Sequence, residues 1–105
     1  CSGKIYYELL KERQTDEIAI VRLEQLYPLP FEQLAKLEKT YGISEWVWVQ
    51  EEPKNMGAWP FICCHLDQLK WSCIAKPASS SPAVGNSKLH AKQQQDVIDA
   101  ALKLN

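Results

Sequence analysis

The chain has 105 residues, 46% of them hydrophobic, and its 12 basic side chains against 13 acidic ones leave a formal net charge of −1. This length allows one domain with a single hydrophobic core, which we assign to residues 1–105. The charge balance excludes the basic surface typical of nucleic-acid binding, and no apolar stretch reaches the roughly 20 residues that cross a bilayer. We therefore expect neither nucleic acid nor a membrane as a partner.

Four cysteines are spread over the chain, at positions 1, 63, 64 and 73. Their spacing contains no Cys-x-x-Cys pair and does not resemble a disulfide framework. Cys63, Cys64 and His65 are adjacent in a stretch that we expect to be helical, where consecutive side chains point about 100° apart and do not converge on one ion. We predict reduced thiols, as in cytosolic proteins, and no metal site.

The first expected elements are a helix and a strand. Apolar side chains at helical spacing over 5–10 predict a helix that Ser2 caps and that ends near Arg13. The apolar run 18–23 predicts a strand covered on both faces. We expect the first strand of the domain to precede Cys1 and the chain to be the C-terminal fragment of a longer protein.

A proline-rich stretch leads into the second helix. The prolines keep 27–30 extended, because each restricts the residue before it. Pro30 then opens a helix over 31–41, and Gly42 suits the position just after its end. The side chains of this helix expected to face the core are Phe31, Leu34, Ala35, Leu37 and Tyr41.

The centre of the chain is a strand over 46–49 that has no polar member, which is typical of a central strand covered on both faces. Pro53 cannot donate to a sheet ladder, so pairing should stop near it. Gly57 predicts a turn with positive φ, and Pro60 suits the first turn of a following helix. Structural roles, in the core or at an interface, are expected for Trp46, Trp48, Pro53, Gly57 and Trp59.

The remaining elements continue the alternation of strands and helices. The third helix is expected to run to about Leu69, before a short strand over 72–76 and a loop of small residues over 78–86. A last helix covers about 89–102, and we expect its polar first turns, around Gln94, to project past the sheet edge. Alternating buried strands and helices predict a three-layer α/β/α domain with a small, mainly parallel sheet.

Charged side chains of both signs lie where the predicted strands end, the usual location of ligands in open α/β sheets: Arg22, Glu24, Glu51, Glu52 and Lys76. Arg22 and Lys76 follow two of the strands, and Lys88 and His90 begin the last helix. Such cations, with free amides at a helix N-terminus, suit a phosphate group. These four residues are our candidates for binding an anionic effector.

The sequence contains no catalytic constellation that we can identify. It has neither a phosphate-binding loop nor an ordered set of nucleophile, base and acid. Glu51 and Glu52 could act as a general acid–base pair, but adjacent residues on a strand point to opposite faces. We predict no catalytic residue.

Several motifs occur in an order that resembles one family. The motifs are Cys1–Lys4 with Tyr6 and Tyr7, Arg22–Pro30, Gln50–Pro53 with Asn55, Gly57 and Trp59, Pro82–Gly85, and Lys88–His90. Together they resemble the C-terminal domain of the decarboxylating component of the 2-oxoglutarate dehydrogenase complex, over essentially the whole chain. The corresponding domains of transketolase and pyruvate dehydrogenase share the general pattern but are less similar.

The resemblance implies that the longer protein is a thiamine-diphosphate and Mg²⁺ enzyme of the tricarboxylic acid cycle. It would decarboxylate 2-oxoglutarate and pass the succinyl group to the lipoamide of a dihydrolipoyl succinyltransferase. In this family the cofactor and the catalytic histidines belong to upstream domains, so this chain is expected to bind no cofactor and to lack catalysis alone. It would help to build a homodimer, in bacterial cytoplasm or in the mitochondrial matrix of a eukaryote.

The resemblance also leaves alternative functions open. Some members carry a site for an adenine nucleotide or acetyl-CoA in this domain, and Arg22 and Lys76 match its basic positions. Our main interpretation is an assembly and regulatory domain of 2-oxoglutarate dehydrogenase. The alternatives are a nucleotide- or acetyl-CoA-sensing module, or the same domain of another thiamine-diphosphate enzyme. Sensing is favoured if Arg22, Lys76 and Lys88 line one pocket.

Overall fold

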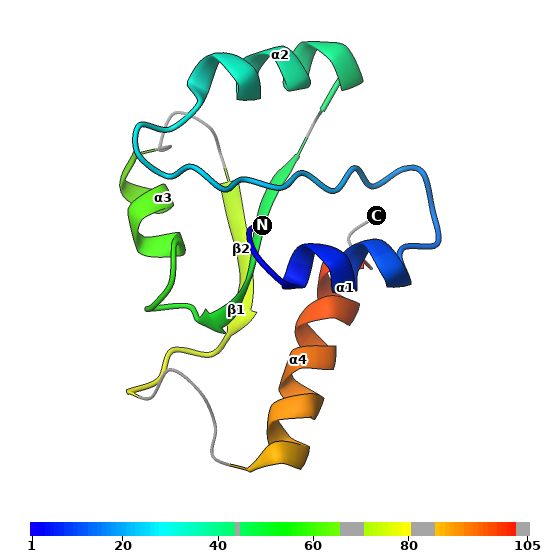
Figure 1. Ribbon diagram of the computed structural model, residues 1–105, viewed down its shortest axis with the longest axis vertical. Coiled ribbons are helices and arrows are strands. Elements are labelled where there is room, and N and C mark those ends of the chain that lie inside the picture. Colours follow the sequence, from blue (N-terminus) through cyan, green and yellow to red (C-terminus); the bar gives the residue numbers. More distant parts are fainter. Residues whose placement is uncertain (44, 66–70, 81–85, 103–105) are drawn as a thin grey trace.

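The computed structural model describes residues 1–43, 45–65, 71–80 and 86–102. The elements are α1 (Ile5–Glu12), α2 (Phe31–Tyr41), β1 (Trp46–Pro53), α3 (Trp59–His65), β2 (Trp71–Lys76) and α4 (Ser87–Leu102). Figure 1 shows α3 on one side of the two strands and α1 with α4 on the other. The predicted α/β/α arrangement is confirmed. None of the described helices has the length and apolar character needed to span a bilayer.

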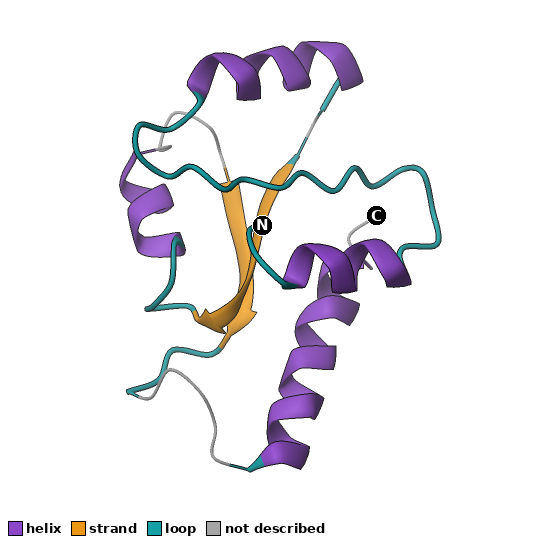
Figure 2. Cartoon of the chain, viewed as in Figure 1, coloured by secondary structure: helices purple, strands orange, loops and turns teal. Residues whose placement is uncertain are grey.

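The two strands pair in parallel, with α3 in the connection between them (Figure 2). Trp46 lies opposite Trp71, and pairing is regular as far as Val49. The register then shifts, and Pro53 is matched with Lys76. Proline lacks the N–H that a regular ladder needs, so the irregularity falls where the sequence predicted pairing to stop.

Strand β1 contributes to hydrophobic clusters on both faces of the sheet. Val49 packs with buried residues of α1 and α4. Trp48, which is 1% exposed, packs on the other face with Leu23, Leu29 and Ile62. Successive strand residues point to opposite faces, so the two-sided burial predicted from the apolar run is confirmed. Burial of each such side chain contributes about 1.5–3 kcal/mol.

The strand predicted over 18–23 is wrong. The structure gives this stretch no strand, and it forms part of the long connection between α1 and α2 that crosses the view of Figure 2. Within the described part of the chain, its backbone pairing is with Cys1: the Leu23 N–H donates to the Cys1 carbonyl at 2.7 Å. An apolar run predicts burial, but a strand also requires a hydrogen-bonded neighbour along its length.

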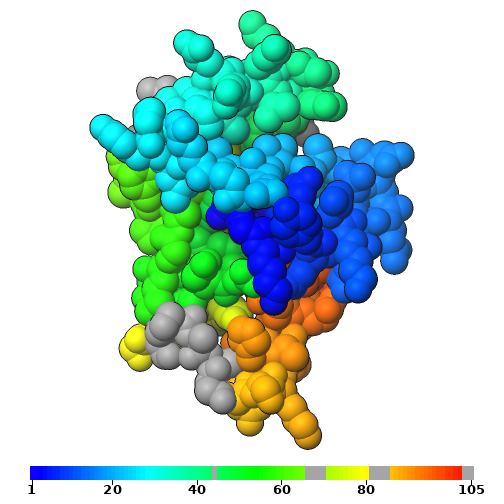
Figure 3. Space-filling model, in the orientation of Figure 1, coloured from blue at the N-terminus to red at the C-terminus, as the bar shows by residue number. Residues whose placement is uncertain are grey.

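Helix α2 was predicted correctly in extent but not in orientation. It begins after Pro30 and ends at Gly42, which adopts a positive φ of 59°. Leu34 is buried, whereas Phe31 and Tyr41 are 53% and 66% exposed. Ala35 is exposed as well, so the expected inward face is wrong for these three residues. In Figure 3 the helix forms the top of the molecule, above the sheet. Periodicity identifies an apolar side but not the element that covers it.

The start of α1 differs slightly from the prediction. The residue before α1 is Lys4 and not Ser2, because a turn at Gly3, with φ of 71°, moves the helix start to Ile5.

Helix α4 begins at Ser87, earlier than the sequence suggested. The Asn86 side chain caps it, since Oδ1 accepts from the N–H groups of Lys88 at 2.9 Å and Leu89 at 3.1 Å. The expected continuation of α3 to Leu69 and the loop residues 81–85 lie outside the described residues.

Gly57 has the predicted positive φ, 65°. A Cβ at this position would lie 3.0 Å from Glu52 Oε2 and 3.2 Å from Gln50 Oε1. We expect Gly57→Val to lower the free energy of unfolding by about 1–3 kcal/mol, because a β-branched residue tolerates this backbone poorly. Chemical denaturation measures the change, with exposed Lys54→Val as the control from the same turn. Equal unfolding free energies for the two variants would contradict the requirement for glycine.

Candidate functional site

The carboxyl ends of β1 and β2 are held next to each other by their loops. The Lys54 N–H donates to the Lys76 carbonyl at 2.9 Å. Asn55 pairs twice with the backbone of Ser79: its Nδ2 donates to the carbonyl and its Oδ1 accepts from the N–H, both at 2.9 Å. A side-chain amide here reproduces the two-bond pattern of strand pairing, which fixes the rim where ligands of α/β sheets usually bind.

Gln50, which the sequence analysis named as part of a motif without giving it a role, organises the exit of β1. It is 3% exposed. Its Oε1 accepts from the Trp48 indole N–H and from the Trp59 backbone N–H, both at 3.0 Å. Its Nε2 donates to the carbonyls of Pro53 at 2.9 Å and Met56 at 2.8 Å. One buried amide therefore joins strand, turn and the start of α3.

The residues expected to be structural lie around this amide or at the start of the strand pair. Trp48 and Trp59 donate to Gln50, and Pro53 accepts from it. Trp46 stacks on Trp71 across the strand pair, with ring centroids 5.0 Å apart and planes 2° from parallel. The sequence signal for Gln50 was its position: a polar residue directly follows a run with no polar member.

Lys76 and His90 are the two effector candidates that the structure brings together. Lys76 is 5% exposed, and its Nζ lies 3.4 Å from His90 Nδ1. The described ion pairs link other residues, so no carboxylate among the described residues neutralises this ammonium group. A buried cation normally has a negative partner. This corner can therefore accept an anionic group.

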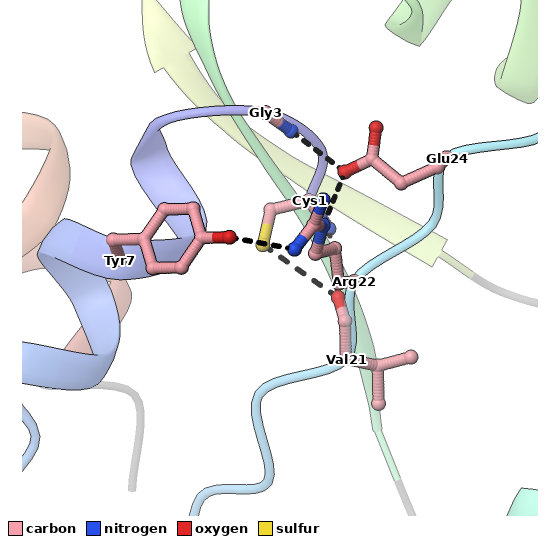
Figure 4. Close-up of polar contacts among 6 residues, drawn as sticks. All are labelled: Cys1, Gly3, Tyr7, Val21, Arg22 and Glu24. Carbon is pink, nitrogen blue, oxygen red and sulfur yellow. Dashed lines mark hydrogen bonds and ion pairs between the residues drawn. The ribbon is translucent and has the colours of Figure 1, made fainter.

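Arg22 belongs to a different cluster, shown in Figure 4. Its Nε donates to Glu24 Oε1 at 2.7 Å, and its Nη1 donates to the Tyr7 hydroxyl at 2.8 Å. The same Glu24 oxygen accepts from the Gly3 N–H at 3.0 Å. The Gly3 bond, followed by the Arg22 bond, lowers the pKa of the exposed Glu24 carboxyl. Arg22 thus has an anionic partner already.

Lys88, the fourth candidate, is an exposed residue of the first turn of α4, one residue beyond Ser87. It shares this turn with His90. The four predicted residues therefore do not form one site. Lys76 and His90 are in contact, and Lys88 lies at the same end of α4 as His90. Arg22 instead contacts Glu24, Tyr7 and Tyr6.

The expectation that the first turns of α4 project past the sheet is wrong for Gln94. Its Nε2 donates to Glu51 Oε1 at 2.8 Å and to Glu8 Oε2 at 3.2 Å, which joins α4 to β1 and α1. Its Oε1 is buried and has no partner among the described residues. Glu51 is thus bound to an amide, whereas Glu52 is exposed. This arrangement does not favour the hypothesis that Glu51 and Glu52 act as a general acid–base pair.

The cysteines offer no metal site in the described part of the chain. All four are free, and Cys63 and Cys64 are exposed. Among the described residues, no group of three or more potential ligands is placed to hold a metal. Burial raises the pKa of the Cys73 thiol to about 11, so this thiol is protonated at neutral pH and is a weak nucleophile.

We expect Gln50→Leu to lower the free energy of unfolding by about 2–4 kcal/mol. The substitution leaves the Trp48 indole N–H and the Trp59 N–H buried without an acceptor, and each such group costs about 1–3 kcal/mol. Urea denaturation followed by tryptophan fluorescence gives the value. Gln33→Leu is the matched control, because Gln33 is exposed on α2. A Gln50→Leu protein as stable as this control would show that the amide is not needed.

Comparison with known proteins places the chain in a family. A family described as "2-oxoglutarate dehydrogenase C-terminal" matches residues 1–102. The chain is 43% identical over 111 residues to the 2-oxoglutarate dehydrogenase E1 component of Haemophilus influenzae, and 46% identical over 112 residues to that of Rickettsia conorii. Each alignment covers 97% of this chain and 12% of the relative. It is also 44% identical over 110 residues to a multifunctional 2-oxoglutarate metabolism enzyme of a Mycobacterium species, covering 95% of this chain and 9% of that protein.

These matches cover nearly the whole chain, as the resemblance in the motifs does. The chain spans about an eighth of the length of the first two relatives. The chain belongs to the 2-oxoglutarate dehydrogenase C-terminal family.

Proposed function

We propose that this chain is the C-terminal assembly and regulatory domain of a 2-oxoglutarate dehydrogenase E1 component. The observation that carries the proposal is the family match over residues 1–102, together with identities of 43% and 46% to E1 components. The complete protein would use thiamine diphosphate and Mg²⁺ to decarboxylate 2-oxoglutarate, and would transfer the succinyl group to a dihydrolipoyl succinyltransferase. Its location would be bacterial cytoplasm or the mitochondrial matrix.

The contacts of the described residues suit a structural contribution. The buried amide of Gln50 and the paired Asn55 hold the strand ends in one conformation. Glu51 is engaged by Gln94. These groups stabilise the domain and leave the chemical step to other parts of the complete protein.

The exposed aromatic side chains around α2 support a role in homodimer formation. Tyr27 is 83% exposed, and Phe31 and Tyr41 are also mostly exposed. Aromatic residues are enriched at protein–protein interfaces and rare as a group on a free surface. We place the contact with a second copy of the complete protein on this side of the domain.

The activity test compares the complete protein with the chain 1–105. We expect the complete protein, supplied with thiamine diphosphate and Mg²⁺, to release CO₂ from 2-oxoglutarate and to sediment as a dimer. The chain alone should show no turnover, because its described residues form no catalytic arrangement. Turnover of pyruvate in place of 2-oxoglutarate would assign the domain to another thiamine-diphosphate enzyme. Turnover by the chain alone would contradict the assembly role.

A second candidate function, effector binding, rests on Lys76. This ammonium group is buried and has an imidazole, but no described carboxylate, beside it. A phosphate of an adenine nucleotide or of acetyl-CoA would supply the negative partner. Arg22, which already has Glu24, would take part only if that ion pair opened.

We expect Lys76→Met in the complete enzyme to weaken effector binding by about 10- to 150-fold, the value of one charge-assisted hydrogen bond of about 1.5–3 kcal/mol. Calorimetry with AMP, ADP and acetyl-CoA, at low and high salt, measures the affinity, which should fall with salt. Lys92→Met is the control, because Lys92 is an exposed lysine on the same helix as His90 and is not an effector candidate. Equal loss in both variants would indicate non-specific attraction, and no binding at millimolar ligand would exclude the effector role. Arg22→Ala in the same assay tests the remaining candidate.

A further inference from the structure

Helix α2 has a side that the rest of the described structure does not cover. The helix lies at one end of the molecule, above the sheet (Figures 1 and 3). Leu34 is its buried residue, and no other described helix or strand makes an extended contact with it. Ala35 points about 100° away from Leu34 and is exposed, and Phe31, one turn before Ala35, is 53% exposed. An aromatic ring beside a small side chain on a free helix face suits packing against another helix.

The charges on this side of α2 are placed at its two ends. Glu32 is in the first turn and Lys39 is in the last turn. At 100° per residue, they lie about 60° and 40° from Ala35 on the same flank, whereas Phe31 lies on the other flank. Among the described residues, neither Glu32 nor Lys39 forms an ion pair. One flank of the helix therefore has an uncompensated negative charge at its start and an uncompensated positive charge at its end.

We propose that this side of α2 packs against α2 of a second copy, antiparallel, about a two-fold axis that passes near Ala35. The inference rests on the homodimer of the proposed function and adds the residues through which the two copies meet. Two-fold rotation of an antiparallel pair reverses the helix direction but keeps each flank on its own side. Glu32 of each copy then lies beside Lys39 of the other, so the interface contains two equivalent ion pairs.

The spacing of the two charges fits this register. Glu32 is three residues before Ala35 and Lys39 is four residues after it, which corresponds to about 4.5 and 6 Å along the helix. The paired side chains are therefore at nearly the same level once one helix is reversed about Ala35. A parallel pair would instead bring the two Glu32 carboxylates to one end and the two Lys39 ammonium groups to the other, where like charges repel.

The apolar residues of this side suit the same arrangement. A methyl side chain on the axis allows two helices to approach to about 8 Å, the short end of helix-packing distances. The ring of Phe31, on the flank away from the charges, can then pack on the helix of the second copy beside its Ala35. Antiparallel helices also place the positive end of each helix dipole beside the negative end of the other.

The first experiment tests the position of the axis in the complete protein. Ala35→Cys is introduced together with Cys63→Ser and Cys64→Ser, which remove two exposed thiols, and oxidised glutathione is added. Gln33→Cys in the same background is the matched control, because Gln33 is exposed on α2 but points about 160° away from Ala35. Mass spectrometry identifies the cross-linked peptides. We expect position 35 to cross-link to itself about tenfold or more faster than position 33, because neighbouring thiols in a dimer react at a high effective concentration.

The second experiment separates pairing between copies from the stability of the helix. Glu32→Lys and Lys39→Glu, each in the Ala35→Cys protein, place like charges opposite each other and should slow cross-linking about tenfold. The double variant restores opposite charges between the copies, so its cross-linking should return to within about twofold of the original rate. Each exchange also opposes the helix dipole, and the double variant opposes it twice. Effects on helix stability alone would therefore make the double variant the slowest.

Sedimentation of the complete protein distinguishes failure of this inference from failure of the homodimer. A dimer in which position 35 cross-links no faster than position 33 would overturn the α2 contact and leave the homodimer of the proposed function intact. A double variant no faster than the single variants would overturn the antiparallel charge pairing. Cross-linking of position 35 to a segment outside α2 would show that another part of the protein covers this side, and a monomer at every concentration would overturn both proposals.

Discussion

The exit of the central strand depends on the hydrogen bonds of one buried amide. Gln50 accepts from an indole and from the backbone at the start of α3, and it donates to two carbonyls of the turn that follows β1. Only a neutral group with both donors and acceptors can do this in a site that is 3% exposed. A carboxylate would bury a charge, and an apolar side chain would leave the indole and backbone groups unpaired.

The same chemistry recurs where α4 meets α1. Gln94 and Gln95 donate to Glu8 and Glu12 respectively, and Gln94 also reaches Glu51 of β1. Amides can approach carboxylates without introducing a charge of their own, so they join acidic surfaces that would otherwise repel each other. Beneath this seam, Ile5 and Leu9 pack with the apolar side of α4. The polar and apolar contacts therefore align the two helices together.

The sequence was sufficient where local chemistry decides the structure. Pro30 and Gly42 gave the limits of α2, and Gly57 gave the turn after β1, because proline and glycine restrict or permit backbone angles whatever surrounds them. The sequence was insufficient where a partner decides. The run 18–23 has the composition of a strand, yet pairing requires a neighbour that composition does not show.

The same distinction applies to the candidate site, where the sequence predicted some residues correctly and not others. Charge and position identified Lys76 and His90, which are in contact. They also selected Arg22, which is paired with Glu24 two residues further along the chain. The role of Gln50 was not predicted because a glutamine after a strand is usually solvated. Its burial depends on the turn at 53–57, which brings carbonyls to its amide.

The contact between α1 and α4 also has a consequence for synthesis on the ribosome. The bond between Gln94 and Glu8 joins residues 86 positions apart, and the buried cluster around Ile5 includes Ala101. β1 and β2, separated by one short helix, can pair long before α4 has been translated. The apolar side of α1 also packs on Val49 of β1, but it is covered completely only after the interval that ends with the translation of α4. Nascent-chain chaperones would encounter it throughout that interval.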